Sequence, residues 1–183
     1  ENYGEGNDLL REYARYMKHP IINMADDKYH PCQGLSDIMG MRERKGDLKG
    51  KTILMTWAHG ALARSYCSVH ENLLISSRLG MNVRLAYPKG YDLPKEEIDK
   101  VRANCAENGT KFEVVNDAYS GYDKDVEFVY SRNWFGPDFY EIGKEAEIAR
   151  ASKMTDWITD QPRMDKTNEA LYIHPMPVDH VKH

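Results

Sequence analysis

Short apolar runs alternate along the chain with longer amphipathic segments. In several segments, apolar side chains recur three and four residues apart, the pattern of a helix with one buried face. Such helices are expected over about residues 7–17, 35–44, 68–79, 94–108 and 138–152. Apolar runs predict buried strands at about residues 20–24, 51–57, 82–87, 112–115, 126–130 and 170–173. This order predicts an α/β fold, a Rossmann-like parallel sheet with helices on both faces.

Local signals define several helix ends. Ser68 and Glu71 have the spacing of a capping box at the start of one helix. Pro94 suits the first turn of the next helix, and Gly109 suits its left-handed end. Because parallel sheets bind ligands where their strands end, the segments that follow strands are the candidates for chemistry.

The first candidate segment, residues 30–33, opens a helix. The imidazole of His30 and the amide of Gln33 offer donors and acceptors for a small planar group, such as a carbonyl bearing an amine. The helix start adds oriented backbone N–H groups and a partial positive charge. The alternative is a plain His-Pro turn with a buried cysteine.

Two further segments follow predicted strands. Trp57 ends a strand, where a tryptophan usually packs, and the loop 58–67 after it carries His59 and Arg64 as a possible substrate lip. In the segment 130–134, which ends at Trp134, Arg132 could clamp a carboxylate through two parallel hydrogen bonds. A surface arginine is the ordinary alternative.

The last candidate segment is His174-Pro175-Met176-Pro177. Its two prolines fix an extended backbone and leave carbonyl groups free to accept hydrogen bonds. The alternative is a rigid exit turn from the final strand. A metal site built from His59, Cys67 and His70 is a weaker possibility, because their spacing matches no standard zinc pattern.

Composition narrows the function classes. The chain has 183 residues, 41% hydrophobic and 30% charged, with a net charge of −4 and no basic stripe, so we expect no nucleic-acid partner. No apolar run approaches the roughly 18 residues of a membrane span. The three cysteines indicate a reducing cytoplasm. No glycine fingerprint or Walker loop is present, which argues against an unrelated nucleotide-binding fold.

Taken together and in order, these segments resemble the aspartate/ornithine carbamoyltransferase superfamily. The likeness is greatest to its knotted branch, which holds the N-acetylornithine and N-succinylornithine carbamoyltransferases and the YgeW-like group. The motifs are Ile21-Ile22-Asn23 with His30-Pro31-Cys32-Gln33, Leu48-Lys49-Gly50-Lys51, Thr56-Trp57, and the segments 78–83, 88–93, 129–134 and 169–174. Each motif is weak alone, and the ordered set is fairly specific.

The resemblance implies a domain division. Residues 1–30 would end a carbamoyl-phosphate-binding domain with its last helix and strand, residues 31–177 would form the amino-acid-binding domain, and residues 178–183 would be a truncated tail. It also implies a trefoil knot, a homotrimer, and no metal or organic cofactor. The family's phosphate-binding loop is not found here, so we expect only the amino-acid-binding half, inactive by itself.

The resemblance also implies roles for residues. His30 and Gln33 match the pair that contacts the carbamoyl group of carbamoyl phosphate. Arg132 falls where the acylornithine enzymes have a lysine, which suggests an anionic amino-acid substrate. The remaining substrate contacts would be Trp57, Trp134, His174, Pro175 and Met176.

Two functions follow from these assignments. The first is carbamoyl transfer from carbamoyl phosphate to the amino group of an ornithine-like or acylornithine-like amino acid. The second is a non-catalytic ligand-binding module derived from such an enzyme. Pro175 stands where the family has a cysteine, and this departure favours the second.

Overall fold

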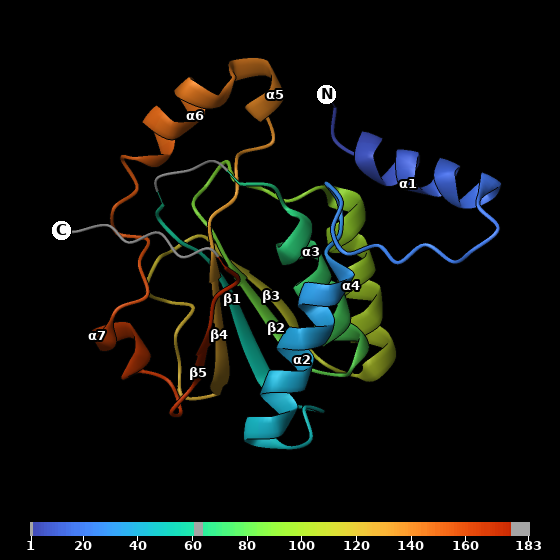
Figure 1. Ribbon diagram of the computed structural model, residues 1–183. Helices are drawn as coiled ribbons and strands as arrows, with labels where there is room; N and C mark the ends of the chain where they lie inside the picture. Colours follow the sequence, from blue (N-terminus) through green and yellow to red (C-terminus); the bar gives the residue numbers. More distant parts are fainter. Residues whose placement is uncertain (1, 61–63, 177–183) are drawn as a thin grey trace.

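The computed structural model describes residues 2–60 and 64–176. Its centre is a five-stranded parallel sheet of order β3-β2-β1-β4-β5, which confirms the predicted fold class (Figure 1). The strands are β1 Thr52–Trp57, β2 Asn82–Ala86, β3 Phe112–Val115, β4 Val126–Arg132 and β5 Leu171–Ile173. From β1 the chain adds β2 and then β3 on one side, and it then crosses to β4 and β5 on the other side of β1. This reversal between β1 and β4 is where ligands of open α/β sheets bind.

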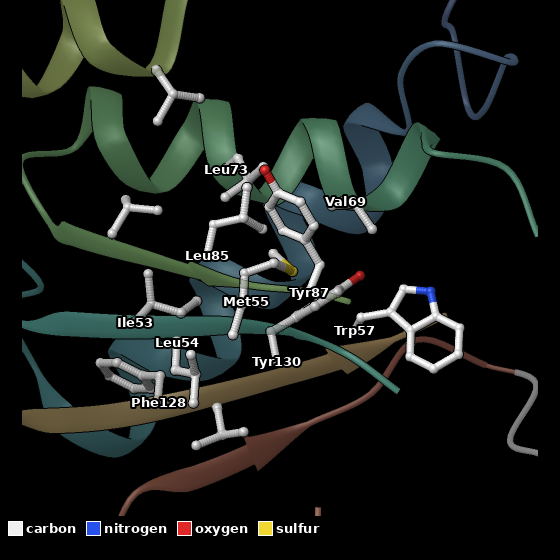
Figure 2. Packing of buried hydrophobic residues seen from close by; sticks show 14 of the residues in the cluster. Ile53, Leu54, Met55, Trp57, Val69, Leu73, Leu85, Tyr87, Phe128 and Tyr130 are labelled. Atoms are coloured by element: carbon white, nitrogen blue, oxygen red, sulfur yellow. The ribbon is translucent and has the colours of Figure 1, made fainter. Parts of the chain in front are cut away.

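Three helices cover one face of the sheet, namely α2 Pro31–Lys45, α3 Cys67–Arg78 and α4 Lys95–Asn108 (Figure 1). Met55, Leu85 and Tyr130 point toward these helices, whereas Leu54 points to the other face (Figure 2). All four side chains are fully buried in the core. Their burial follows the alternation of a strand, in which successive side chains face opposite sides of the sheet.

The other face is covered by α7, Gln161–Met164, and by the loop that precedes β4. Gly121 of this loop lies so close to the sheet that a Cβ atom there would be 2.9 Å from Leu54 Cδ1. Arg163 of α7 is buried and donates from Nε to the carbonyl oxygen of Ala118 at 3.2 Å. The guanidinium of Arg163 can therefore be buried in this helix, because its N–H groups are hydrogen-bonded.

Two local predictions are wrong. Residues 20–24 form no strand, because within the described chain they pair with no other strand, and Ile22 is 79% exposed. The capping box at Ser68 is also wrong, because α3 begins at Cys67 and Ser68 lies inside the helix, fully buried. Both patterns are local, and the packing of the domain overrides them.

The region after β4 contains shorter helices than predicted. The single helix expected at 138–152 is divided into α5 Phe139–Ile142 and α6 Lys144–Ala151 by Gly143, whose φ is 80°. The short α7 was not predicted, although Asp160 caps it by accepting a hydrogen bond from the backbone of Arg163. A four-residue helix is too short to show apolar periodicity.

The N-terminal helix α1, Glu5–Tyr16, lies beside the sheet domain rather than within it (Figure 1). Asp27 fixes its start, with its carboxylate accepting from the backbone N–H groups of Gly4 and Asn7. Large apolar side chains of this region remain exposed: Leu9, Tyr13, Tyr16, Met17, Ile21, Ile22 and Met24. A concentration of exposed large apolar side chains in one region is typical of an interface with another domain.

Two further expectations concern topology and membranes. Residues 61–63, in the loop where the knot was expected, and Pro177, with the tail after it, lie outside the described residues. The knot therefore stays a prediction. Among residues 2–60 and 64–176, no helix has the length and apolar character to cross a bilayer.

Candidate functional site

The candidate segments gather at one edge of the sheet. Helix α2 begins at the edge where the parallel strands end, so His30 and Gln33 share this edge with the segments that follow β1, β4 and β5 (Figure 1). A topological switch point and a helix start thus meet here, which is the usual setting for an anionic or polar ligand.

A small pocket of about 130 Å³ lies at this edge. It brings together side chains from three strand ends: His59 and Arg64 after β1, Asn133 after β4, and His174 after β5. The remaining lining residues are Ala58, Ile158, Thr159 and Tyr172. A guanidinium, an amide and two imidazoles over an apolar floor suit a small ligand that carries a carboxylate.

Arg132 does not line this pocket. Its side chain is 8% exposed, and Nη1 donates to the carbonyl oxygen of Pro175 at 3.5 Å. Its own carbonyl oxygen accepts from the backbone N–H of Ala58 at 3.1 Å. Arg132 therefore links the ends of β1 and β4 to the segment 174–176. Its predicted role as a carboxylate clamp is untested by these contacts.

Trp57 and Trp134 are both fully buried. The indole Nε1 of Trp57 donates to the carbonyl oxygen of Trp134, and the indole Nε1 of Trp134 donates to that of Tyr91, each at 2.9 Å. Trp57 also packs edge-to-face against Tyr91, with ring centroids 5.2 Å apart. These contacts match the packing alternative for Trp57, and substrate contact by either indole stays a prediction.

The start of α2 holds a buried amide–carboxylate chain. Gln33 Nε2 donates to Asp37 Oδ1 at 2.8 Å, and Asn72 Nδ2 donates to Asp37 Oδ2 at 3.2 Å. Burial raises the pKa of Asp37 to about 6, although both amide donors act to lower it. Close by, Nδ1 of His30 is buried without a hydrogen-bond partner among the described residues. A buried ring nitrogen without a partner is uncommon in a folded protein, so His30 stays a candidate for ligand contact.

Of the predicted site residues, His174 reaches the pocket, whereas His30 and Gln33 lie elsewhere on the same edge. Sequence analysis missed Asp37, although an acidic residue four positions after a glutamine in a helix signals a side-chain pair. It also missed Thr159, which comes from an irregular segment with no periodic signal. In the described ranges, no group of three or more His, Cys, Asp or Glu side chains is arranged to hold a metal.

A larger groove of about 550 Å³ lies at the opposite edge, where the strands begin. Its charged groups are mostly paired with one another. Arg84 bonds Glu113 at 2.9 Å and Asp125 at 3.0 Å, and Lys51 lies 3.2 Å from Glu127. This groove lies away from the edge where the strands end, at which open α/β sheets bind their ligands, so it is the weaker candidate.

Comparison with known proteins agrees with the fold. Residues 51–183 match the family described as aspartate/ornithine carbamoyltransferase, Asp/Orn binding domain. The N-acetylornithine carbamoyltransferase of Xylella fastidiosa (strain Temecula1) is 31% identical over 179 residues, covering 96% of this chain and 52% of that protein. The putative carbamoyltransferase YgeW of Escherichia coli K12 is 29% identical over 211 residues, with the same coverage.

Solved structures give the same answer. An acetylornithine transcarbamylase complexed with acetylcitrulline superposes with a TM-score of 0.88 at 28% identity, covering 97% of this chain and 54% of that one. The chain spans about half the length of the relatives that it matches. On the family match, the relatives and the shared fold together, this chain belongs to the aspartate/ornithine carbamoyltransferase family and contains its amino-acid-binding domain.

Proposed function

We propose that the complete protein transfers the carbamoyl group of carbamoyl phosphate to the amino group of an ornithine-like or acylornithine-like amino acid. The observation that carries this proposal is the pocket at the strand ends, which Arg64, Asn133 and His174 line on the same edge of the sheet as the start of α2. One structural neighbour is an N-acetyl-L-ornithine transcarbamylase complexed with carbamyl phosphate and N-succinyl-L-norvaline. These two ligands are a carbamoyl donor and an acylated amino acid.

In this reaction the substrate amine attacks the carbonyl carbon of carbamoyl phosphate. A C–N bond forms, the C–O bond to phosphate breaks, and the proton lost by the amine passes to the departing phosphate. The His30 imidazole can donate an N–H to the carbonyl oxygen as negative charge develops there. The Gln33 carbonyl can accept from the carbamoyl NH₂. Arg64 and Asn133 would hold the substrate carboxylate, so that positioning supplies much of the rate.

A second domain that binds carbamoyl phosphate would also explain why the N-terminal region is exposed. We propose that residues 1–30 belong to a carbamoyl-phosphate-binding domain and that residues 31–177 are the amino-acid-binding domain. The exposed apolar side chains of α1 support this division, because a second domain would bury them. We further propose the branch's trefoil knot and homotrimer, and a cytoplasmic location. All three cysteines are unpaired, which supports a reducing compartment.

The test is label transfer by the protein that the complete gene encodes. With isotope-labelled carbamoyl phosphate and a panel of amines, mass spectrometry should find the label on an ornithine-like or acylornithine-like product. Arg64→Met should reduce kcat/KM for the amino acid by about tenfold to a hundredfold, as expected for loss of a charged contact. Arg78→Met is the matched control, because Arg78 is an exposed arginine at the end of α3, outside the pocket.

A second candidate is the non-catalytic binding module. Pro175 favours it, because proline at this position has no backbone N–H and its carbonyl oxygen is already bonded to Arg132. In that case the protein would bind an acylated amino acid at the same pocket, and no amine in the panel would receive the label.

A further inference from the structure

The buried carboxylate of Asp37 faces the amide of Gln33 one helical turn away. Asp37 is 7% exposed, and its two oxygens accept from different elements, one from Gln33 on its own helix and one from Asn72 on α3. Asn72 is itself oriented by Ser76, whose Oγ donates to Asn72 Oδ1 at 3.3 Å. The chain Ser76–Asn72–Asp37–Gln33 thus runs from the core of α3 to the start of α2.

An ionised carboxylate can only accept hydrogen bonds, so it selects one orientation of any amide that faces it. The NH₂ group of Gln33 must turn toward Asp37, and Oε1 must therefore turn away. We propose that Asp37 is a positioning residue that presents the Gln33 carbonyl oxygen as an acceptor for the NH₂ of a bound carbamoyl group. This inference rests on the proposed function and extends it to a residue that touches no substrate.

Protonation of Asp37 removes this preference for one orientation of the Gln33 amide. A protonated Asp37 can donate to Gln33 Oε1, which lets the amide turn over and present its NH₂ instead. Two NH₂ groups would then face each other, and the carbamoyl group would lose its acceptor. Burial raises the pKa of Asp37 to about 6, which places this change within a working pH range.

The surroundings of Asp37 contain few other titrating groups. On α3 the facing residue is the neutral Asn72, and Glu71 lies beside Gly34 at the helix start. From β4 comes Tyr130, whose pKa is raised by burial and then by the charge of Asp37. Asp37 also lines a groove of about 370 Å³, in which the other charged or titratable groups are Arg44 and Tyr172 of β5. Neither tyrosine titrates near pH 6, because burial raises both pKa values above the ordinary 10.

The first test is a pH titration of the 183-residue chain, followed through side-chain amide signals in ¹H–¹⁵N NMR spectra. The signals of Gln33 and Asn72 should shift together with one midpoint near pH 6, and Asp37→Asn should abolish that transition. The chain carries its own matched control, since the exposed side chain of Gln161 donates from Nε2 to Asp165 Oδ1 at 2.7 Å with the same spacing. Asp165→Asn should leave the Gln33 titration unchanged. A Gln33 amide signal that Asp37→Asn leaves unchanged at pH 8 would overturn the proposal, because Asp37 would then not orient that amide.

This test needs no substrate, so it separates the positioning role from the proposed reaction. In the complete protein, Asp37→Asn should raise KM for carbamoyl phosphate about tenfold and remove the loss of affinity below pH 6. Asn72→Ala is the structural control, because it removes the contact with α3 and leaves the Gln33–Asp37 pair. It should lower stability and move the pH profile toward higher pH, because the Asn72 amide acts to lower the pKa of Asp37, while the transition itself persists. An unchanged KM and profile in Asp37→Asn would sink the positioning role even if label transfer occurs.

Discussion

The indole N–H of Trp57 donates to the carbonyl oxygen of Trp134 at 2.9 Å, which ties the end of β1 to the segment that follows β4. Both side chains are buried, so neither water nor another residue can replace the bond. Residues that follow β1 and β4 line the candidate pocket. A second bond joins the same two segments at the pocket, because the backbone N–H of Phe135 donates to the carbonyl oxygen of Arg64 at 3.0 Å.

Trp57→Phe should destabilise the fold while keeping most of the aromatic packing. The variant leaves a buried carbonyl oxygen without its donor, a loss of about 1–3 kcal/mol. Urea denaturation should show this loss as a lower midpoint. Tyr16→Phe is the control, because Tyr16 is 79% exposed and should change stability by less than about 0.5 kcal/mol. Equal midpoints for the two variants would contradict the structural role of the Trp57 bond.

Substitution by alanine should have opposite effects on stability at Gly121 and Gly40. Gly121→Ala should destabilise by about 1–3 kcal/mol, because its Cβ would lie 2.9 Å from Leu54 Cδ1 in a packed core. Gly40→Ala should stabilise by about 0.5–1 kcal/mol, because Gly40 lies within α2 and nothing surrounds its Cβ position within 4 Å. Thermal melts of both variants provide the measurement. A stabilised Gly121→Ala protein would show that the loop before β4 does not pack on the sheet as described.

The ionised carboxylate of Asp37 should destabilise the fold, because it is buried. Its folded pKa, about 6, lies above the ordinary 3.8, so the folded state holds a proton that the unfolded state releases between these values. Stability is then lost as pH rises from about 4 to 6. Asp37→Asn, which mimics the protonated form, should be about 1–2 kcal/mol more stable than wild type at pH 8 and equal to it near pH 4. Denaturation at the two pH values provides the comparison, and a variant that is less stable at pH 8 would refute this explanation.

His70 should give the opposite pH dependence. Burial lowers the pKa of His70 to about 4 from 6.5, and its Nδ1 lies 3.1 Å from the carbonyl oxygen of Lys28. The neutral form stabilises the fold above pH 6.5, and that contribution is lost as pH falls through 4. His70→Gln should flatten this acid limb in a plot of unfolding free energy against pH. An acid limb that persists unchanged in the variant would assign it to other groups.

Sequence periodicity was sufficient for the sheet and the long helices, because β1 and β4 are buried on both faces and read as continuous apolar runs. It failed at residues 20–24, because an apolar run becomes a strand only when a neighbouring strand pairs with it. Exposed Ile22 shows that apolar residues can also mark a surface for another domain.

The candidate site was only partly predictable for a similar reason. His174 and Arg64 follow strands, so a rule about strand ends finds them. Asp37 occupies the middle of a helix, and its importance depends on burial beside Gln33 and Asn72, which no local pattern encodes. Arg132 and Trp134 also follow from the rule, yet both turn inward, because the buried carbonyl groups around them need donors.

The central claim is that an acylated amino acid binds where the strands end. Titration of the ¹⁵N-labelled chain with an N-acylated ornithine tests it most directly. Backbone signals of Arg64, Asn133 and His174 should shift together and saturate, and Arg64→Met should weaken that response. Shifts that gather instead at Lys51, Arg84 and Lys111, around the groove where the strands begin, would contradict it.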